Sequence, residues 1–291
     1  MSVTAIKDRI PLGISTCIFE IVILTAIAVI VKYVSPDISV ITILFFRYVF
    51  SIPLLIVVGI IQRGKKLFQV NKKKILLART VIGMIGLSSY FIAIALIGIG
   101  KTIALGQLVT IFITILAPII LSEKVGIRRW IAVLVGLIGS IIIINPSHSG
   151  WFNFGILWGL NATFFAALLN IFLRKLGLTD EPISTALWYN IAGTVLFTFL
   201  FFLLDYPLPQ DIHIWLILIT CGILSSFQQF LLAFSRSLAP AIILAPLQYL
   251  AVPISFLVAI YLFNESLGWN FILGTTIIIS STFYISLKSR F

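Results

Sequence analysis

Long apolar runs, separated by short polar stretches, fill almost the whole of this chain. A helix needs about 20 apolar residues to cross a hydrocarbon core about 30 Å thick, and most of the runs approach that length. In lipid every backbone amide must find a partner within its own segment, which favours helices over strands. We therefore expect an all-α, multi-pass membrane protein. The pattern predicts ten transmembrane helices, at residues 11–31, 38–61, 75–96, 103–122, 130–144, 154–173, 185–204, 212–234, 242–263 and 269–287.

Basic residues mark one side of the predicted membrane. The connection between the second and third helices, residues 63–74, is rich in lysine, whereas residues 205–211 carry two aspartates and no lysine or arginine. Basic loops stay in the cytoplasm. This asymmetry predicts that residues 63–74 are cytoplasmic, and with them both termini.

The net charge of +11 follows from the same arrangement. Cations at the ends of membrane helices face anionic lipid headgroups, so we expect membrane lipids as partners and no nucleic acid. Hydrophobic residues make up 60% of the chain and the connections between the helices are short, which leaves no room for a soluble domain.

The two halves of the chain resemble each other. At one common shift Gly13 aligns with Gly155, and Glu123 with Glu265. Weak internal repeats are typical of transporters, and an odd number of helices per repeat inverts the second copy. The sequence thus predicts two inverted five-helix repeats, residues 1–148 and 149–291.

Two charged residues, Glu20 and Arg47, fall near the middle of the first two predicted helices. Charges at the centre of a bilayer are costly and usually functional. Their similar depth in neighbouring helices favours a Glu20–Arg47 ion pair, either structural or part of a substrate or proton site. Arg79 lies about one turn inside the third helix, from where we expect it to extend to the headgroups.

Uncharged polar and aromatic side chains inside other helices are candidates for the lining of a cavity. We predict this role for Tyr90, Gln107, Gln228, Gln248 and Tyr249. Four prolines are expected to kink or to start the fourth and ninth helices: Pro118, Pro240, Pro246 and Pro253.

The sequence contains few residues in a pattern that would suit a catalytic or a metal-binding site. Cys17 and Cys221 lie within predicted helices and lack metal-ligand spacing, and acids and histidines form no catalytic grouping. We therefore expect neither an enzyme nor a cofactor. A membrane-embedded enzyme acting on lipid and a structural subunit without transport remain the alternatives from other classes.

Several of these features resemble the drug/metabolite transporter superfamily and its EamA-type members. They are the residues Phe45-Phe46-Arg47, a glutamate at the end of the fourth and ninth helices, and the segment 122–130. The resemblance implies a ten-helix secondary transporter of the bacterial inner membrane, which works by alternating access around a central cavity. Proton coupling and the choice between monomer and homodimer stay open.

Two subgroups supply the substrate hypotheses. Residues 245–265 are similar to bacterial S-adenosylmethionine uptake carriers, and residues 123–130 are equally similar to riboflavin carriers. S-adenosylmethionine carries cations, a carboxylate and a purine, which suits Glu20, Arg47 and either Tyr90 or Tyr249. We rank S-adenosylmethionine uptake first, with riboflavin uptake and amino-acid or drug efflux as alternatives.

Overall fold

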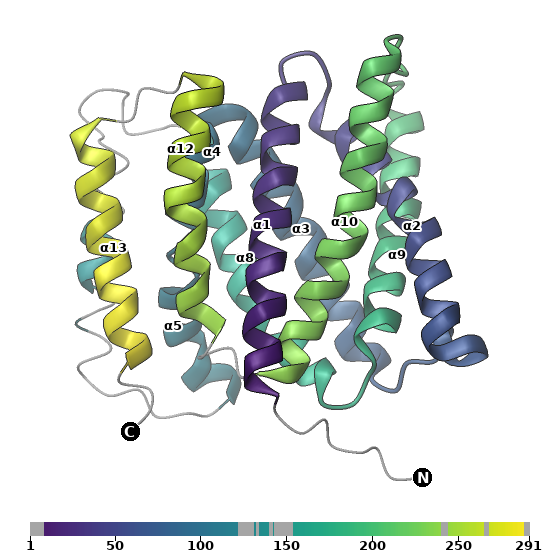
Figure 1. Cartoon of the computed structure of the whole chain (residues 1–291), viewed down its shortest axis with the longest axis horizontal. Coiled ribbons are helices and arrows are strands. Elements are labelled where there is room, and N and C mark those ends of the chain that lie inside the picture. The colour runs from purple at the N-terminus through teal and green to yellow at the C-terminus, as the bar shows by residue number, and fades with distance from the viewer. Residues whose placement is uncertain are drawn as a thin grey trace. The chain divides into compact units, whose positions relative to one another are not determined.

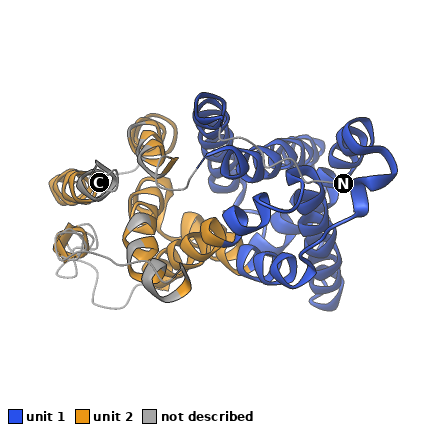
Figure 2. Ribbon diagram, turned by 90° about the horizontal axis from the view of Figure 1, so that it is seen from below, with its two compact units in different colours: residues 1–84, 172–240 blue, residues 85–171, 241–291 orange. Residues whose placement is uncertain are grey.

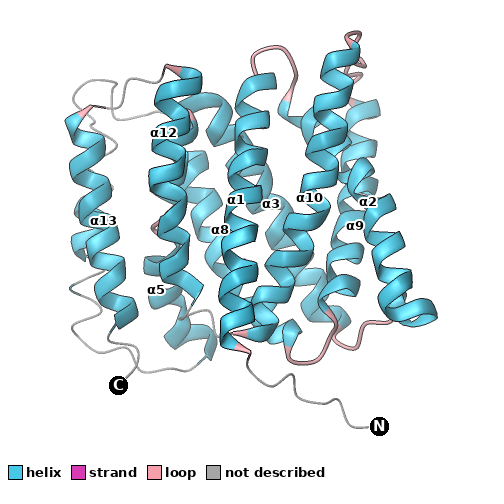
Figure 3. Ribbon diagram, viewed as in Figure 1, coloured by secondary structure: helices cyan, strands magenta, loops and turns pink. Residues whose placement is uncertain are grey.

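The computed structural model describes residues 9–121, 131, 134–139, 142, 154–239, 244–264 and 268–287. The described residues form helices joined by turns and loops (Figure 3). Seven of the fifteen residues of the predicted helix 130–144 lie outside them, as do Glu123, Glu265 and Pro240.

Within the part of the chain that the structure describes, six helices are long and apolar enough to cross a membrane. Figure 1 shows these helices in the cartoon of the chain. Each corresponds to a predicted span, and the ends differ by only a few residues. They are α1 (Ile10–Val34), α2 (Val40–Arg63), α3 (Lys73–Ile97), α8 (Phe154–Gly177), α9 (Pro182–Leu203) and α10 (Ile212–Leu238).

The predicted helix 103–122 is divided into two shorter helices, α4 (Ile99–Gly106) and α5 (Val109–Leu121). Pro118 lies inside α5. The break is at Gln107 and Leu108, whose amides bond carbonyls only three residues back. Gln107 reinforces this turn by donating from its side chain to the Ile103 carbonyl at 3.1 Å.

The predicted helix 242–263 is also interrupted. It consists of the 3₁₀ helix η2 (Ala245–Leu250) and the α-helix α12 (Ala251–Phe263), and α13 (Trp269–Leu287) follows. Pro246 lies in the 3₁₀ segment and Pro253 in the first turn of α12, where the missing amide hydrogen of proline removes no helical bond.

The chain divides into two compact units (Figure 2). Unit 1 contains residues 1–84 and 172–240, and unit 2 contains residues 85–171 and 241–291. Each unit takes segments from both predicted halves, and the helices α3 and α8 each contribute to both units.

Close helix contacts in unit 1 occur at glycines. The helix α10 packs against α1, α2 and α9, and α2 also packs against α9. A Cβ atom at Gly222 would collide with the backbone and Cβ of Phe50, and one at Gly193 with the ring of Tyr48. Small residues of this kind allow membrane helices to approach closely.

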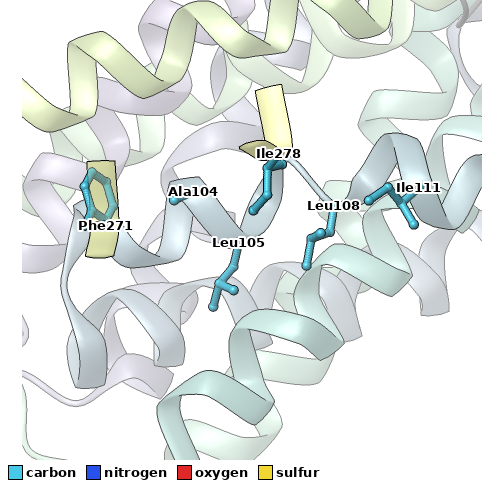
Figure 4. Close-up of a cluster of buried hydrophobic side chains, with 6 residues drawn as sticks. All are labelled: Ala104, Leu105, Leu108, Ile111, Phe271 and Ile278. Atoms are coloured by element: carbon cyan, nitrogen blue, oxygen red, sulfur yellow. The ribbon is translucent and has the colours of Figure 1, made fainter. Parts of the chain in front are cut away.

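Unit 2 has an apolar core around the break between α4 and α5. Leu105, before the break, and Leu108, within it, belong to a buried cluster with two residues of α13, Phe271 and Ile278 (Figure 4). This cluster holds the interrupted segment in place.

A loop of unit 1 fixes the start of α3. Asp180, between α8 and α9, accepts hydrogen bonds from the amides of Asn71 and Lys72 and from the Thr179 hydroxyl. The carboxylate thus binds the amides of the two residues that lead into α3 and anchors the chain where the helix begins. The short 3₁₀ helix η1 (Gly64–Phe68) precedes it, and Trp188 of α9 donates to the Phe68 carbonyl.

Candidate functional site

Glu20 is buried in unit 1 and pairs with Arg236 of α10. Its side chain is 1% exposed, and its Oε2 accepts from Arg236 Nη1 at 3.1 Å. Its Oε1 accepts from Gln228 Nε2 at 3.0 Å. Glu20 is thus paired with Arg236 rather than with Arg47, because α10 packs along α1 and presents both of these partners to it.

A chain of amides links this carboxylate to Arg79. Arg79 Nη2 donates to Gln229 Oε1 at 2.9 Å, and Gln229 Nε2 donates to Gln228 Oε1 at 3.0 Å. Every donor in the chain is directed toward the negative charge of Glu20. Hydrogen bonds aligned in this way polarise one another and reinforce the ion pair at the end of the chain.

Arg79 does not extend to the headgroup region, contrary to the sequence-based expectation. It is 0% exposed, and its guanidinium lies over the ring of Tyr189, with the Cζ atom 4.0 Å from the ring centroid. Stacking on an aromatic face and the bond to Gln229 give this cation partners inside the protein.

Arg47 lies close to a pair of buried tyrosines. Its Cζ atom is 4.8 Å from the centroid of the Tyr48 ring, and Tyr48 shares a 2.7 Å hydrogen bond between hydroxyls with Tyr189. Next to this pair, Ser51 donates to Asn190 at 2.7 Å. The helices α2 and α9 are therefore joined by polar contacts that are fully buried.

The predicted residues fall into both units. Glu20, Arg47 and Gln228 belong to unit 1, and the structure brings Glu20 and Gln228 into contact. The other four belong to unit 2: Tyr90, Gln107, Gln248 and Tyr249. Tyr90 and Gln248 are partly buried, Gln107 is buried, and the side chain of Tyr249 lies outside the described residues.

Four members of the buried polar network are not among the residues predicted from the sequence: Tyr48, Tyr189, Gln229 and Arg236. The predicted helix 212–234 ends before Arg236, whereas α10 continues to Leu238. The spacing of seven residues between Gln229 and Arg236 was the available signal, since positions i and i+7 share one helix face.

Among the described residues, no group of three or more His, Cys, Asp or Glu side chains is arranged to hold a metal ion. The side-chain donors of the buried network described above are guanidinium, amide, phenol and serine hydroxyl groups. These groups suit hydrogen bonding to an organic molecule or an anion better than metal coordination.

Solved structures include one with the same fold. A crystal structure superposes on this chain with a TM-score of 0.71 at 13% identity, and the match covers 96% of this chain and 97% of that chain.

Curated relatives are transporters. A riboflavin transporter of Vibrio cholerae is 31% identical over 72% of this chain and 70% of its own length. An S-adenosylmethionine uptake transporter of Rickettsia bellii is 26% identical over 94% of this chain and 93% of its own length. The model of the EamA-like transporter family matches twice, at residues 11–145 and 153–287. With two matches to the EamA model and six membrane-length helices among its described residues, the chain is a multi-pass membrane protein that belongs to the EamA-like transporter family.

Proposed function

We propose that this protein is a secondary transporter that takes up a small zwitterionic metabolite by alternating access, with S-adenosylmethionine as the first candidate. The observation that carries the proposal is the buried network around Glu20 and Arg236, inside helices long enough to span a membrane. Charges of both signs at such a depth are costly and mark substrate or ion pathways.

The chemistry of the substrate supports this ranking. A zwitterion offers a cation to Glu20, in competition with Arg236, and a carboxylate to Arg47. The other residues proposed for the pathway are Tyr90, Gln107, Gln228, Gln248 and Tyr249, of which the tyrosines suit a purine ring. The S-adenosylmethionine carrier of Rickettsia bellii also matches this chain over nearly its whole length.

The finer architecture belongs to the same proposal. Ten helices, arranged as inverted repeats with both termini in the cytoplasm, would place the protein in a bacterial inner membrane. Inverted repeats support two mirror-related states, one open to each side, which alternating access requires.

Riboflavin uptake is the second candidate. It is favoured by the 31% identity to the Vibrio cholerae riboflavin transporter. Riboflavin is neutral, so it would use aromatic and amide groups and leave the buried charges without a direct contact.

Proteoliposomes with the purified protein test the proposal. We expect uptake of labelled S-adenosylmethionine, inhibition by unlabelled S-adenosylhomocysteine, and no inhibition by riboflavin. Uptake of riboflavin without S-adenosylmethionine would reverse the ranking. If the folded protein moves no member of a metabolite panel into or out of the vesicles, the transport proposal is wrong.

A further inference from the structure

Unit 1 holds more buried positive than negative charge in the helices that its described residues form. The buried ionisable acids and bases of these helices are Glu20, Arg47, Arg79 and Arg236. Arginine stays protonated in proteins. Three of these four groups are therefore cations, and the carboxylate among them, Glu20, is paired with Arg236. Asp180, a further buried carboxylate among the described residues of the unit, is bound at the start of α3.

Arg79 also has unused donors. Of its nitrogens, Nη2 donates to Gln229, whereas Nε and Nη1 have no hydrogen-bond partner among the described residues. The side chain is 0% exposed, so the protein screens these donors from its surroundings. Its stacking on Tyr189 occupies the face of the guanidinium and leaves the N–H groups in the plane available. Buried donors of this kind are costly unless an acceptor binds to them.

The tyrosine pair adds a further donor at the same place. In the hydrogen bond between the hydroxyls of Tyr48 and Tyr189, one hydroxyl donates and the other keeps its own proton for another acceptor. Both guanidinium charges, Arg47 and Arg79, interact electrostatically with Tyr48 and with each other. Two like charges held near one another in a low dielectric favour an anion beside them.

We propose that Arg79, Arg47 and the Tyr48–Tyr189 pair bind one small anionic group inside unit 1. Its chemistry is that of a carboxylate or a halide, which accepts from several N–H and O–H donors at once. The group is either the carboxylate of the transported metabolite, which rests on the function proposed above, or a free chloride ion. Because Arg79 is also the first donor of the amide chain that ends at Glu20, occupancy of this site is coupled to the Glu20–Arg236 pair.

Thermal unfolding of the full-length protein in detergent tests the site without any transport measurement. One arm compares sodium chloride with sodium gluconate at equal ionic strength. The other compares S-adenosylmethionine with its decarboxylated analogue. A higher Tm in chloride than in gluconate identifies a halide site, and stabilisation by S-adenosylmethionine but not by its analogue identifies a substrate carboxylate.

Arg79→Gln should lower the affinity for the anion that stabilises the wild-type protein by about 10–100-fold, as expected for the loss of charged hydrogen bonds. Arg63→Gln, which removes an arginine that bonds Ser184 near the end of α2, should leave the anion response unchanged. If Arg79→Gln does not fold, Arg79→Lys and Tyr189→Phe replace it. The first keeps the charge with fewer donors, the second keeps the stacking ring, and both should weaken the response.

Equal Tm values of the wild-type protein in chloride and gluconate, together with equal responses to the two adenosyl compounds, would overturn the proposal. So would an unchanged anion response in a folded Arg79→Gln protein. The outcome is separable from that of the proposed function. If the anion raises the Tm of a protein that transports no metabolite, the anion site is supported and the transport proposal is contradicted. If the wild-type protein takes up a metabolite but no anion changes its Tm, transport is supported and the anion site is contradicted.

Discussion

At the scale of single residues, the pairing of Glu20 with Arg236 dominates the interior of unit 1. Both side chains are buried, and each of the two carboxylate oxygens of Glu20 has a partner. Replacing both members of such a pair is often tolerated, whereas removing one leaves the other charge buried without compensation.

Glu20→Gln should therefore lower the free energy of unfolding by about 3–5 kcal/mol, because Arg236 loses its counter-charge. Thermal unfolding in detergent measures the change. Glu181→Gln, at an exposed glutamate next to α9, is the matched control and should change stability by less than about 0.5 kcal/mol. The double variant Glu20→Gln with Arg236→Gln should lose less than the sum of the two single changes. Strict additivity would show that the pair contributes no coupling energy.

Sequence reasoning found the buried charges of Glu20 and Arg47 but not their partners. Depth along a helix follows from counting residues, and this places a charge inside the membrane. The partner depends on how each helix is rotated about its axis. The helix α1 is apolar on all sides, so its sequence has no polar face to define that rotation. The same gap explains why Arg79 was expected at the headgroups.

At the scale of elements, close packing of helices depends on the absence of a Cβ atom at particular glycines. Gly222→Ala should destabilise the protein by about 1–3 kcal/mol, because the new methyl group collides with Phe50 of α2. Gly106→Ala is the control, since a Cβ there meets nothing within 4 Å. A lower Tm for Gly222→Ala than for Gly106→Ala is the expected result, and equal values would contradict the packing of α2 on α10.

The start of α3 gives a second prediction at this scale. Asp180→Ala removes the carboxylate that binds the amides of Asn71 and Lys72, at a cost of about 1–2 kcal/mol. We expect faster tryptic cleavage in the lysine-rich segment 72–74 as the first turn of α3 opens. Asp37→Ala, at an exposed aspartate between α1 and α2, should leave the cleavage rate as it is in wild type. Equal rates in the two variants would show that Asp180 does not hold this turn.

Long helices were predictable as elements because an apolar run of membrane length has one stable solution in lipid. The interruptions were less predictable. The break at Gln107 arises from local hydrogen bonds around one amide side chain, whereas α5 continues through Pro118. Proline changes a helix only where its ring and missing amide conflict with the preceding turn, and the sequence does not show which carbonyls find other partners.

At the scale of the whole molecule, the proposed topology places residues 63–74 and 205–211 on opposite sides of the membrane. Cysteines at Gln69 and Gln210, both exposed, should react with an impermeant maleimide from opposite sides of the cell membrane. The background needs Cys17→Ala and Cys221→Ala, although both native cysteines are fully buried. Labelling of both positions from the outside would contradict the inverted arrangement.

Unit 1 is built from two segments far apart in the chain, residues 1–84 and 172–240, and this has a consequence for biosynthesis. Glu20 and Arg236 are separated by 216 residues. At synthesis rates of about 5–20 residues per second, Glu20 is added to the chain about 10–40 s before Arg236, the partner of its carboxylate. Gln228, the other partner of Glu20, is made only shortly before Arg236. During this interval the nascent α1 would expose an unpaired carboxylate to lipid, unless the insertion machinery shelters it. Chains that end before α10 should consequently be retained by that machinery or degraded, while the full-length chain is released into the bilayer.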